Sequence, residues 1–223
     1  MIPNLHYPSY FVFRFLALTA WLISKPLWFI RFKGCENIPP AKSSGILIVA
    51  NHQTYLDPVW ISIKMHRKMQ YMAYDKAFEW KFVGALIKYL GSFPVKHPID
   101  TSTSFVKRSL VALRDGAGLI IFPEGAREFA DGELMEFKTG AAHLAQRAGV
   151  QILPVSIIGG ERIWPQKQKY PNLFRPLTLI FHPPMTIDER QDLSKATARI
   201  KAVIESGIIT NKALTASTDQ VAD

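Results

Sequence analysis

A histidine and an aspartate five positions apart are the strongest candidates for chemistry in this sequence. His52 and Asp57 belong to the segment NHQTYLD, which directly follows an apolar run. A carboxylate beside an imidazole fixes the tautomer of the ring and stabilises its protonated form, while the other ring nitrogen can accept a proton from a substrate. The pair therefore indicates general acid–base chemistry; a structural histidine beside an aspartate that only caps a helix would give the same pattern.

The backbone around this pair decides whether the two side chains can meet. On an uninterrupted helix, residues five positions apart point about 140° away from each other. Pro58 follows Asp57, and a proline moves the preceding residue out of the helical region while fitting well in the first turn of a helix. We therefore expect His52 at the end of a strand, Asp57 as the N-cap of a helix, and a loop that folds one side chain back on the other.

A second group of candidate residues, FPEGAR, follows another apolar run and occupies positions 122–127. Gly125 can adopt a positive φ and allow close approach to the backbone, and the planar guanidinium of Arg127 suits a phosphate. The carboxylate of Glu124 could hold that arginine or a substrate hydroxyl. An ordinary turn with a solvated ion pair is the alternative, because exposed ion pairs contribute little.

A third segment, GSFPVKH at 91–97, adds two potential cations, Lys96 and His97.

Alternating apolar runs and helical patterns place these segments in one architecture. Short continuous apolar runs predict buried strands, and a 3.6-residue periodicity with glycine or proline boundaries predicts helices. Strands that alternate with helices predict an α/β domain with a largely parallel sheet flanked by helices. In such sheets ligands bind beyond the C-terminal ends of the strands, where the polar segments lie. The predicted strands cover 45–50, 92–96, 119–122, 152–157 and 177–181, and the predicted helices begin at 58 or cover 78–90, 101–115, 137–148 and 194–206.

The N-terminal residues 10–32 are apolar and aromatic, but Arg14, Lys25 and Pro26 interrupt them. The longest uncharged run, 15–24, would rise only ~15 Å as a helix, about half of a ~30 Å hydrocarbon core. Pro26 predicts a break or kink just before it, with one helix near 9–24 and a short second one near 26–32. We expect this segment to insert into one leaflet, with its cations reaching anionic head groups. A helix hairpin packed on the core and a true span are the alternatives.

The composition limits the chemical classes of partner that the chain can bind. The chain has 27 Lys and Arg against 18 Asp and Glu, a net charge of +9, so we expect an anionic partner. No recognised nucleic-acid motif occurs and the apolar N-terminus needs a lipid-like explanation, so we expect no nucleic-acid binding. The single cysteine, Cys35, excludes an internal disulfide and a multi-cysteine zinc cage. The N-terminus lacks the pattern of a cleavable secretory signal.

The order and spacing of these segments resemble the glycerolipid acyltransferase family, and particularly the bacterial 1-acyl-glycerol-3-phosphate acyltransferases. NHQTYLD is similar to the family block NHxxxxD, FPEGAR to FPEGTR, GSFPVKH to the second block and ILPVSI to the fourth. The resemblance covers about residues 38–181. Two positions depart from the pattern: His97 stands where the second block usually ends in Arg, and Ala126 replaces the usual Thr.

The resemblance implies a membrane-associated enzyme that transfers a fatty acyl group from acyl-CoA or acyl-carrier protein to the free hydroxyl of 1-acyl-glycerol-3-phosphate, giving phosphatidic acid. It implies that His52 is the general base, that Asp57 orients it, and that the acceptor oxygen attacks the thioester directly, without an acyl-enzyme, metal or further cofactor. It also implies that Arg127, with Lys96 and His97, holds the acceptor phosphate. Glu124, beside Gly125, would position the glycerol.

The expected organisation is an N-terminal membrane-associating segment (1–36), an acyltransferase domain (37–207) and a polar tail (208–223). The expected partners are the lysophospholipid, the acyl thioester and a membrane surface, with acyl-carrier protein if it is the donor. The expected location is the cytoplasmic face of the plasma (inner) membrane. Three alternatives remain: an acyltransferase for another lysophospholipid, a non-catalytic lipid-surface or acyl-CoA binding protein, and a thioesterase whose base activates water.

Overall fold

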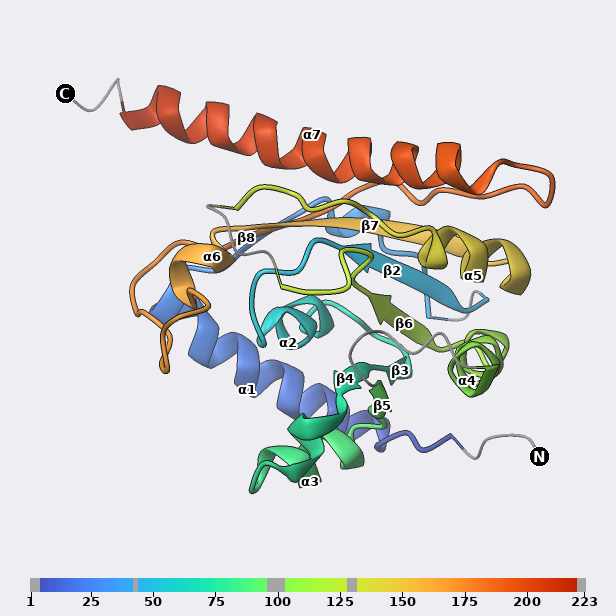
Figure 1. The fold of residues 1–223 in the computed structure, drawn as a ribbon. Helices are drawn as coiled ribbons and strands as arrows, with labels where there is room; N and C mark the ends of the chain where they lie inside the picture. Colours follow the sequence, from blue (N-terminus) through green and yellow to red (C-terminus); the bar gives the residue numbers. More distant parts are fainter. Residues whose placement is uncertain (1–4, 42–43, 96–102, 128–131, 220–223) are drawn as a thin grey trace.

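The computed structural model describes residues 5–41, 44–95, 103–127 and 132–219 (Figure 1). A six-stranded sheet with the order β1-β8-β7-β2-β6-β3 forms its centre. Every neighbouring pair is parallel except β7 and β8. The predicted α/β fold with a largely parallel sheet is therefore confirmed. The strands are β1 (Arg31–Lys33), β2 (Ile46–Ala50), β3 (Met69–Gln70), β6 (Gly118–Ile121), β7 (Gln151–Ile158) and β8 (Thr178–Phe181).

The central strand β2 separates two apolar cores. Its five residues are all buried, as expected for a continuous apolar run between two parallel neighbours. Because side chains alternate across a strand, Leu47 and Val49 enter one core while Ile46, Ile48 and Ala50 enter the other. The first core is covered by α4 (Thr103–Arg114), α5 (Gly140–Ala148) and α7 (Leu193–Asp219), and the second by α1 (Tyr10–Trp28), α2 (Asp57–Ser62) and α6 (Gly160–Ile163). In Figure 1, α7 and α1 lie on opposite sides of the sheet.

Strand register brings the predicted chemical segments together. Val49 pairs with Ile121 and Ala50 pairs with Val155. The chain therefore leaves β2 and β6 side by side, at the same edge of the sheet. NHQTYLD and FPEGAR both begin at that edge.

A smaller unit lies between β3 and α4. Strands β4 (Met72–Tyr74) and β5 (Phe93–Val95) form a separate parallel pair, and Pro94 lies in it. Between them are the 3₁₀ helix η2 (Asp75–Glu79) and α3 (Val83–Tyr89). The single helix predicted over 78–90 is thus divided, because Phe82 adopts φ 62°, outside the helical region. Another 3₁₀ helix, η1 (Cys35–Asn37), follows β1.

The N-terminal segment forms one helix, and the predicted break at Pro26 is wrong. Pro26 lies in the last turn of α1, two residues before its end, so its missing N–H removes only one of the final hydrogen bonds. The short helix predicted over 26–32 is also wrong, because Arg31–Lys33 form β1 and pair with β8. Arg14 does not reach toward head groups: its Nη1 donates to the carbonyl oxygens of Ile63 and Met65, 3.4 and 3.1 Å away.

The C-terminal helix α7 is longer than the sequence predicts. It extends to Asp219 instead of ending near Ser206, so the residues predicted as a polar tail begin as helix. Ile204, Ile208 and Asn211 on this helix are buried. Packing of this continued face on the sheet explains why the helix persists into a more polar sequence.

Candidate active site

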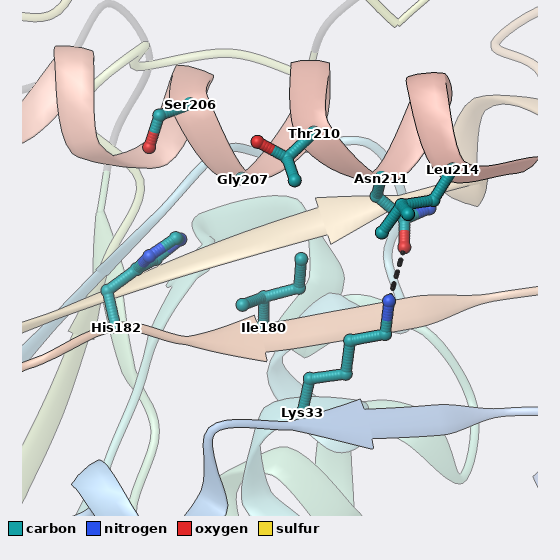
Figure 2. Close-up of a pocket in the computed structure, with 8 residues that line it drawn as sticks. All are labelled: Lys33, Ile180, His182, Ser206, Gly207, Thr210, Asn211 and Leu214. Carbon is teal, nitrogen blue, oxygen red and sulfur yellow. Dashed lines mark hydrogen bonds between the residues drawn. The ribbon is translucent and has the colours of Figure 1, made fainter.

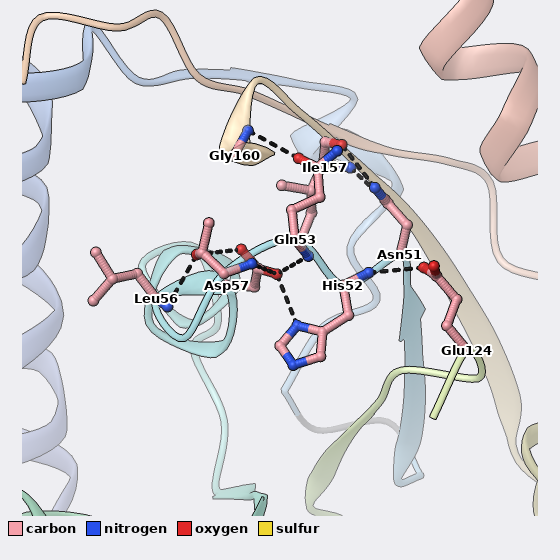
Figure 3. Close-up of polar contacts among 9 residues, drawn as sticks. Asn51, His52, Gln53, Leu56, Asp57, Glu124, Ile157 and Gly160 are labelled. Atoms are coloured by element: carbon pink, nitrogen blue, oxygen red, sulfur yellow. Dashed lines mark hydrogen bonds and ion pairs between the residues drawn. The ribbon is translucent and has the colours of Figure 1, made fainter. Parts of the chain in front are cut away.

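His52 and Asp57 are in contact, as their spacing predicts. His52 lies in the loop after β2, and Asp57 is the first residue of α2. Nδ1 of His52 lies 2.9 Å from Oδ2 of Asp57 (Figure 3). Asp57 does not act as the predicted N-cap, because its carboxylate turns back to the loop before the helix. The interpretation of Asp57 as a simple helix cap is therefore wrong.

The carboxylate of Asp57 is fully buried and surrounded by donors. Oδ2 accepts hydrogen bonds from the backbone N–H of Gln53 at 2.6 Å and of Thr54 at 2.8 Å, besides contacting His52. Oδ1 accepts the hydroxyl of Thr54 at 2.7 Å. A buried charge is tolerated when such hydrogen bonds satisfy it. This role of Thr54 was not predicted from the sequence, where a hydroxyl three positions before the aspartate is the available signal.

Two contacts orient the ring of His52: Phe122 stacks on its face, and Asp57 contacts Nδ1. The ring stacks on Phe122, with ring centroids 4.0 Å apart and planes 14° from parallel. With an ionised Asp57, the proton sits on Nδ1 and the lone pair on Nε2. Within the described part of the chain, Nε2 has no hydrogen-bond partner, and the side chain is 19% exposed. Nε2 can therefore accept a proton from an incoming group.

Glu124 joins the two segments through backbone contacts. Its Oε1 accepts the backbone N–H of His52 at 2.9 Å, and its Oε2 accepts that of Met135 at 3.2 Å. Glu124 is buried, with 3% of its surface exposed. These contacts fix the position of the His52 backbone relative to β6. Sequence reasoning assigned Glu124 to a substrate hydroxyl or to Arg127 and missed this contact with His52.

Gly125 and Arg127 continue the same turn. Gly125 adopts φ 74°, the positive value predicted for it, and its N–H donates to the carbonyl of Phe122. The guanidinium carbon of Arg127 lies 3.8 Å from the ring centre of Tyr55, a cation–π contact. This contact brings Arg127 to the loop that carries His52. Tyr55 also meets the rings of Trp80 and Trp164 edge-on, with centroids 5.6 Å apart in each case.

Two amides that the sequence analysis left without a role anchor the His52 loop to β7 and α6. The side chain of Asn51 donates to the carbonyl of Ile157 and accepts its N–H, both at 2.8 Å. Oε1 of Gln53 accepts the N–H of Gly160 at 2.8 Å. The predicted phosphate-binding residues Lys96 and His97 lie outside the described residues.

A pocket of about 320 Å³ lies between α7 and the strands β1 and β8, and none of the predicted site residues that the structure describes lines it (Figure 2). Beside it, Nε2 of His182 lies 2.8 Å from the hydroxyl of Ser156. Ser156 is fully buried and its hydroxyl donates to the carbonyl of Ile204, so this pair does not form an activated nucleophile. The pocket is lined by Lys33, Ile180, His182, Ser206, Gly207, Thr210, Asn211 and Leu214.

The chain matches a family model described as Acyltransferase over residues 29–158, more than half of its length. It is 30% identical over 154 residues to the chloroplastic 1-acyl-sn-glycerol-3-phosphate acyltransferase LPAT1 of Arabidopsis thaliana, covering 68% of this chain and 42% of that protein. It is 29% identical over 125 residues to the 1-acyl-sn-glycerol-3-phosphate acyltransferase of Bacillus subtilis (strain 168), covering 56% of this chain and 60% of that protein. The chain thus spans less than two thirds of the length of either relative.

A crystal structure shows the same fold. The 1-acyl-sn-glycerophosphate (LPA) acyltransferase PlsC from Thermotoga maritima superposes with a TM-score of 0.70 at 24% sequence identity. The match covers 90% of this chain and 79% of that one. The mostly parallel sheet with its flanking helices is therefore shared with a solved structure.

Proposed function

Because the chain belongs to the acyltransferase family, we propose that it transfers a fatty acyl group from an acyl thioester to the free hydroxyl of 1-acyl-glycerol-3-phosphate, giving phosphatidic acid. The names of its relatives, 1-acyl-sn-glycerol-3-phosphate acyltransferases, support this acceptor. The observation that carries the proposal is the contact of His52 Nδ1 with the buried Asp57, which leaves Nε2 to face a substrate. The thioester is that of acyl-CoA or acyl-carrier protein.

The proposed reaction uses His52 twice. Nε2 accepts the proton of the acceptor hydroxyl while the oxygen attacks the carbonyl carbon of the thioester. Asp57 stabilises the imidazolium that forms. The tetrahedral intermediate then expels the thiolate, which takes the proton back from Nε2 and leaves as the thiol. The new ester bond replaces the thioester bond, and the enzyme returns to its starting state.

Arg127 is the proposed contact for the acceptor phosphate. Only one face of its guanidinium lies on Tyr55, so the N–H groups at the edge of the plane can still donate to a phosphate in a bidentate manner. Lys96 and His97 are proposed to add positive charge. Gly125 allows close approach of the substrate to the backbone, and Glu124 is proposed to position the glycerol as well as the His52 backbone.

The exposed face of α1 supports the proposed membrane association. Apolar side chains line the side of α1 that faces away from the domain, at helical spacing, and Phe11 is the most exposed of them, at 83%. Arg14 near the N-terminal end and Trp28 at the C-terminal end contact the domain, so the helix lies along it. In the described part of the chain, α1 is the helix that is long and apolar enough to span a membrane. We propose that α1 lies in one leaflet, at the cytoplasmic face. The exposed residues of this face are Phe11, Phe15, Leu18 and Leu22.

The test is acyl transfer by the purified full-length chain. Labelled 1-acyl-glycerol-3-phosphate in mixed vesicles is incubated with acyl-CoA and, separately, with acyl-carrier protein carrying the same chain. We expect labelled phosphatidic acid with at least one donor, and product formation by His52→Ala that is slower by about 10²- to 10⁴-fold. Thiol release that does not require lysolipid would instead indicate a thioesterase. A folded protein that forms no product with either donor would contradict the proposal, and a panel of other lysolipids would identify a different acceptor.

A further inference from the structure

The segment between α6 and β8 combines positive charge with exposed aromatic side chains. No Asp or Glu occurs from position 162 to position 187, whereas Lys167, Lys169 and Arg175 are all exposed. Within the described residues, none of these three has a carboxylate partner. Tyr170 and Phe174 expose 70% and 64% of their surface. Neither the motifs of the sequence nor the proposed reaction assigns this segment a role.

This segment is fixed to the C-terminal end of α1. The N–H of Phe174 donates to the carbonyl of Leu27 at 2.6 Å, and Nε1 of Trp28 donates to the carbonyl of Asn172 at 2.8 Å. The rings of Phe174 and Phe29 are in contact, with centroids 6.4 Å apart. In Figure 1 the segment lies beside that end of α1. The exposed aromatics of the segment therefore continue the exposed apolar face of α1.

The backbone conformation fixes the outward orientation of the Phe174 side chain. Phe174 adopts φ 57°, a left-handed conformation that a bulky residue rarely adopts without surrounding constraints. Hydrogen bonds on both sides provide these constraints: the N–H of Asn172 donates to Ile163, and the N–H of Phe174 to Leu27. The ring is therefore presented outward by an ordered backbone.

The same segment borders the candidate active site. Trp164, at its start, contacts Tyr55 edge-on, and Tyr55 carries the guanidinium of Arg127 on its ring. A lipid surface that contacts the segment would thus lie close to the proposed phosphate contact. Basic side chains beside exposed aromatics are the combination that binds anionic lipid surfaces, since the cations attract the head groups and the rings enter the interface.

We propose that residues 164–177 form a docking surface for a bilayer that carries anionic head groups, with Lys167, Lys169 and Arg175 supplying the charge and Tyr170 and Phe174 the apolar contact. The proposal rests on the proposed function in one respect, that the acceptor is drawn from a bilayer. It adds to the apolar face of α1 a contact that depends on lipid charge.

The test is flotation of the full-length protein with vesicles of phosphatidylcholine, with and without phosphatidylglycerol. Replacing Lys167, Lys169 and Arg175 by Gln should weaken binding to the anionic vesicles about 10- to 100-fold and leave binding to pure phosphatidylcholine nearly unchanged. The matched control replaces three exposed cations elsewhere, on α5, before α7 and on α7, and should retain anionic binding. Those control residues are Arg147, Arg190 and Lys195.

A second pair of variants tests the apolar part. Phe174→Ser should weaken binding to both kinds of vesicle, whereas Ile209→Ser, which changes an exposed residue of α7 on the opposite side of the sheet, should not.

Equal losses of anionic binding from the two triple variants would show that net charge alone attracts the protein and would overturn the proposal. Unchanged binding of the Lys167, Lys169 and Arg175 variant would also overturn it.

Acyl transfer to a short-chain lysolipid in free solution separates this proposal from the proposed function. The docking variants should keep wild-type turnover in that assay, because they alter no residue of the reaction. If the wild type is inactive while the contrast in flotation remains, the proposed function fails and the docking surface stands. Equal unfolding temperatures of all variants show that the comparisons report on folded protein.

Discussion

The hydroxyl of Thr54 donates to Oδ1 of Asp57 over 2.7 Å, on the carboxylate oxygen that His52 does not contact. The same hydroxyl oxygen accepts the N–H of Leu56 at 3.0 Å, which directs its single proton to Asp57. Thr54 is fully buried. It is therefore a positioning residue, which acts on His52 through the orientation of Asp57.

Thr54→Val tests this positioning role because valine keeps the shape of threonine and removes the hydroxyl. We expect kcat to fall about tenfold and the free energy of unfolding to fall by about 1–3 kcal/mol, since Oδ1 loses a buried donor. Thr54→Ser, which keeps the hydroxyl, should retain most of the wild-type kcat and most of the wild-type free energy of unfolding. The pH profile of kcat distinguishes positioning from general stability: a shift in the Val variant but not in the Ser variant supports the role. An unchanged profile in a destabilised Val variant would limit Thr54 to packing.

Removing the proposed base should abolish most activity without unfolding the protein. We expect His52→Ala to lower kcat about 10²- to 10⁴-fold, the usual loss for a general base. The imidazole is partly exposed, so its removal leaves no large buried cavity. Asp57→Asn should also lower kcat severely, because a neutral amide cannot stabilise the imidazolium and would place its NH2 group against either the backbone donors of Gln53 and Thr54 or the Thr54 hydroxyl. Near-normal turnover by folded His52→Ala would contradict the mechanism.

Arg127→Ala should affect the acceptor more than the donor. We expect a higher KM for the lysophosphatidic acid and little change in the KM for the acyl thioester, because a bidentate contact with the phosphate is lost. Arg127→Lys should recover only part of the affinity, since lysine has no planar fork. The measurement is steady-state kinetics with each substrate varied in turn. A raised donor KM with an unchanged acceptor KM would reassign Arg127 to the phosphates of the carrier.

Much of this architecture follows from local sequence signals. β2 and β6 are short apolar runs and β7 is a mostly apolar one, and the sequence predicts each within about one residue. β1, β3 and β4 contain only two or three residues each and are formed by pairing with distant segments, so no local pattern marks them. At Pro26 the opposite occurs: a local pattern predicts a helix break that the structure does not contain. The position of Pro26 in the last turn makes the proline tolerable.

The contacts of the candidate site also fall into those that the sequence can predict and those that it cannot. The contact of His52 with Asp57 could be predicted because their spacing and Pro58 constrain a short loop. The contact of Glu124 with the backbone of His52 joins residues 72 positions apart and depends on the register of β2 with β6. Sequence alone does not fix that register. The pairing of Asn51 with Ile157 depends in the same way on the packing of β2 against β7.

Acid pH should destabilise the fold through His182. Burial lowers the pKa of His182 below its ordinary value of about 6.5. The unfolded state therefore binds a proton more readily than the folded state, and stability is lost as the pH falls below about 6.5. We expect His182→Gln to reduce this loss, measured as the difference in unfolding free energy between pH 7.5 and pH 5.5. His143→Gln, at an exposed histidine of α5, is the control. Equal pH dependence in wild type and His182→Gln would contradict this assignment.

The exposed face of α1 should be required for binding to vesicles and not for the chemistry. Deleting residues 1–33 would not test this cleanly, because it also removes β1 and the buried side chains of Phe13 and Trp28. The double variant Phe11→Ser and Phe15→Ser changes only side chains that face away from the domain. We expect it to float less with all vesicles, to lose activity on vesicle-bound lysolipid and to keep activity on a short-chain lysolipid, because burial of apolar surface in the interface is lost while His52 is untouched.

The control for the α1 variant is the pair Ile209→Ser and Leu214→Ser on α7, where two exposed apolar residues lie across the sheet from α1. We expect this pair to float like the wild type. Raised salt should weaken the binding of the α1 variant and of the wild type to anionic vesicles by a similar factor, because the same charges are screened in both. Equal flotation of the α1 variant and the wild type would place the membrane contact elsewhere. Wild-type protein that only detergent releases from membranes would instead support a spanning α1.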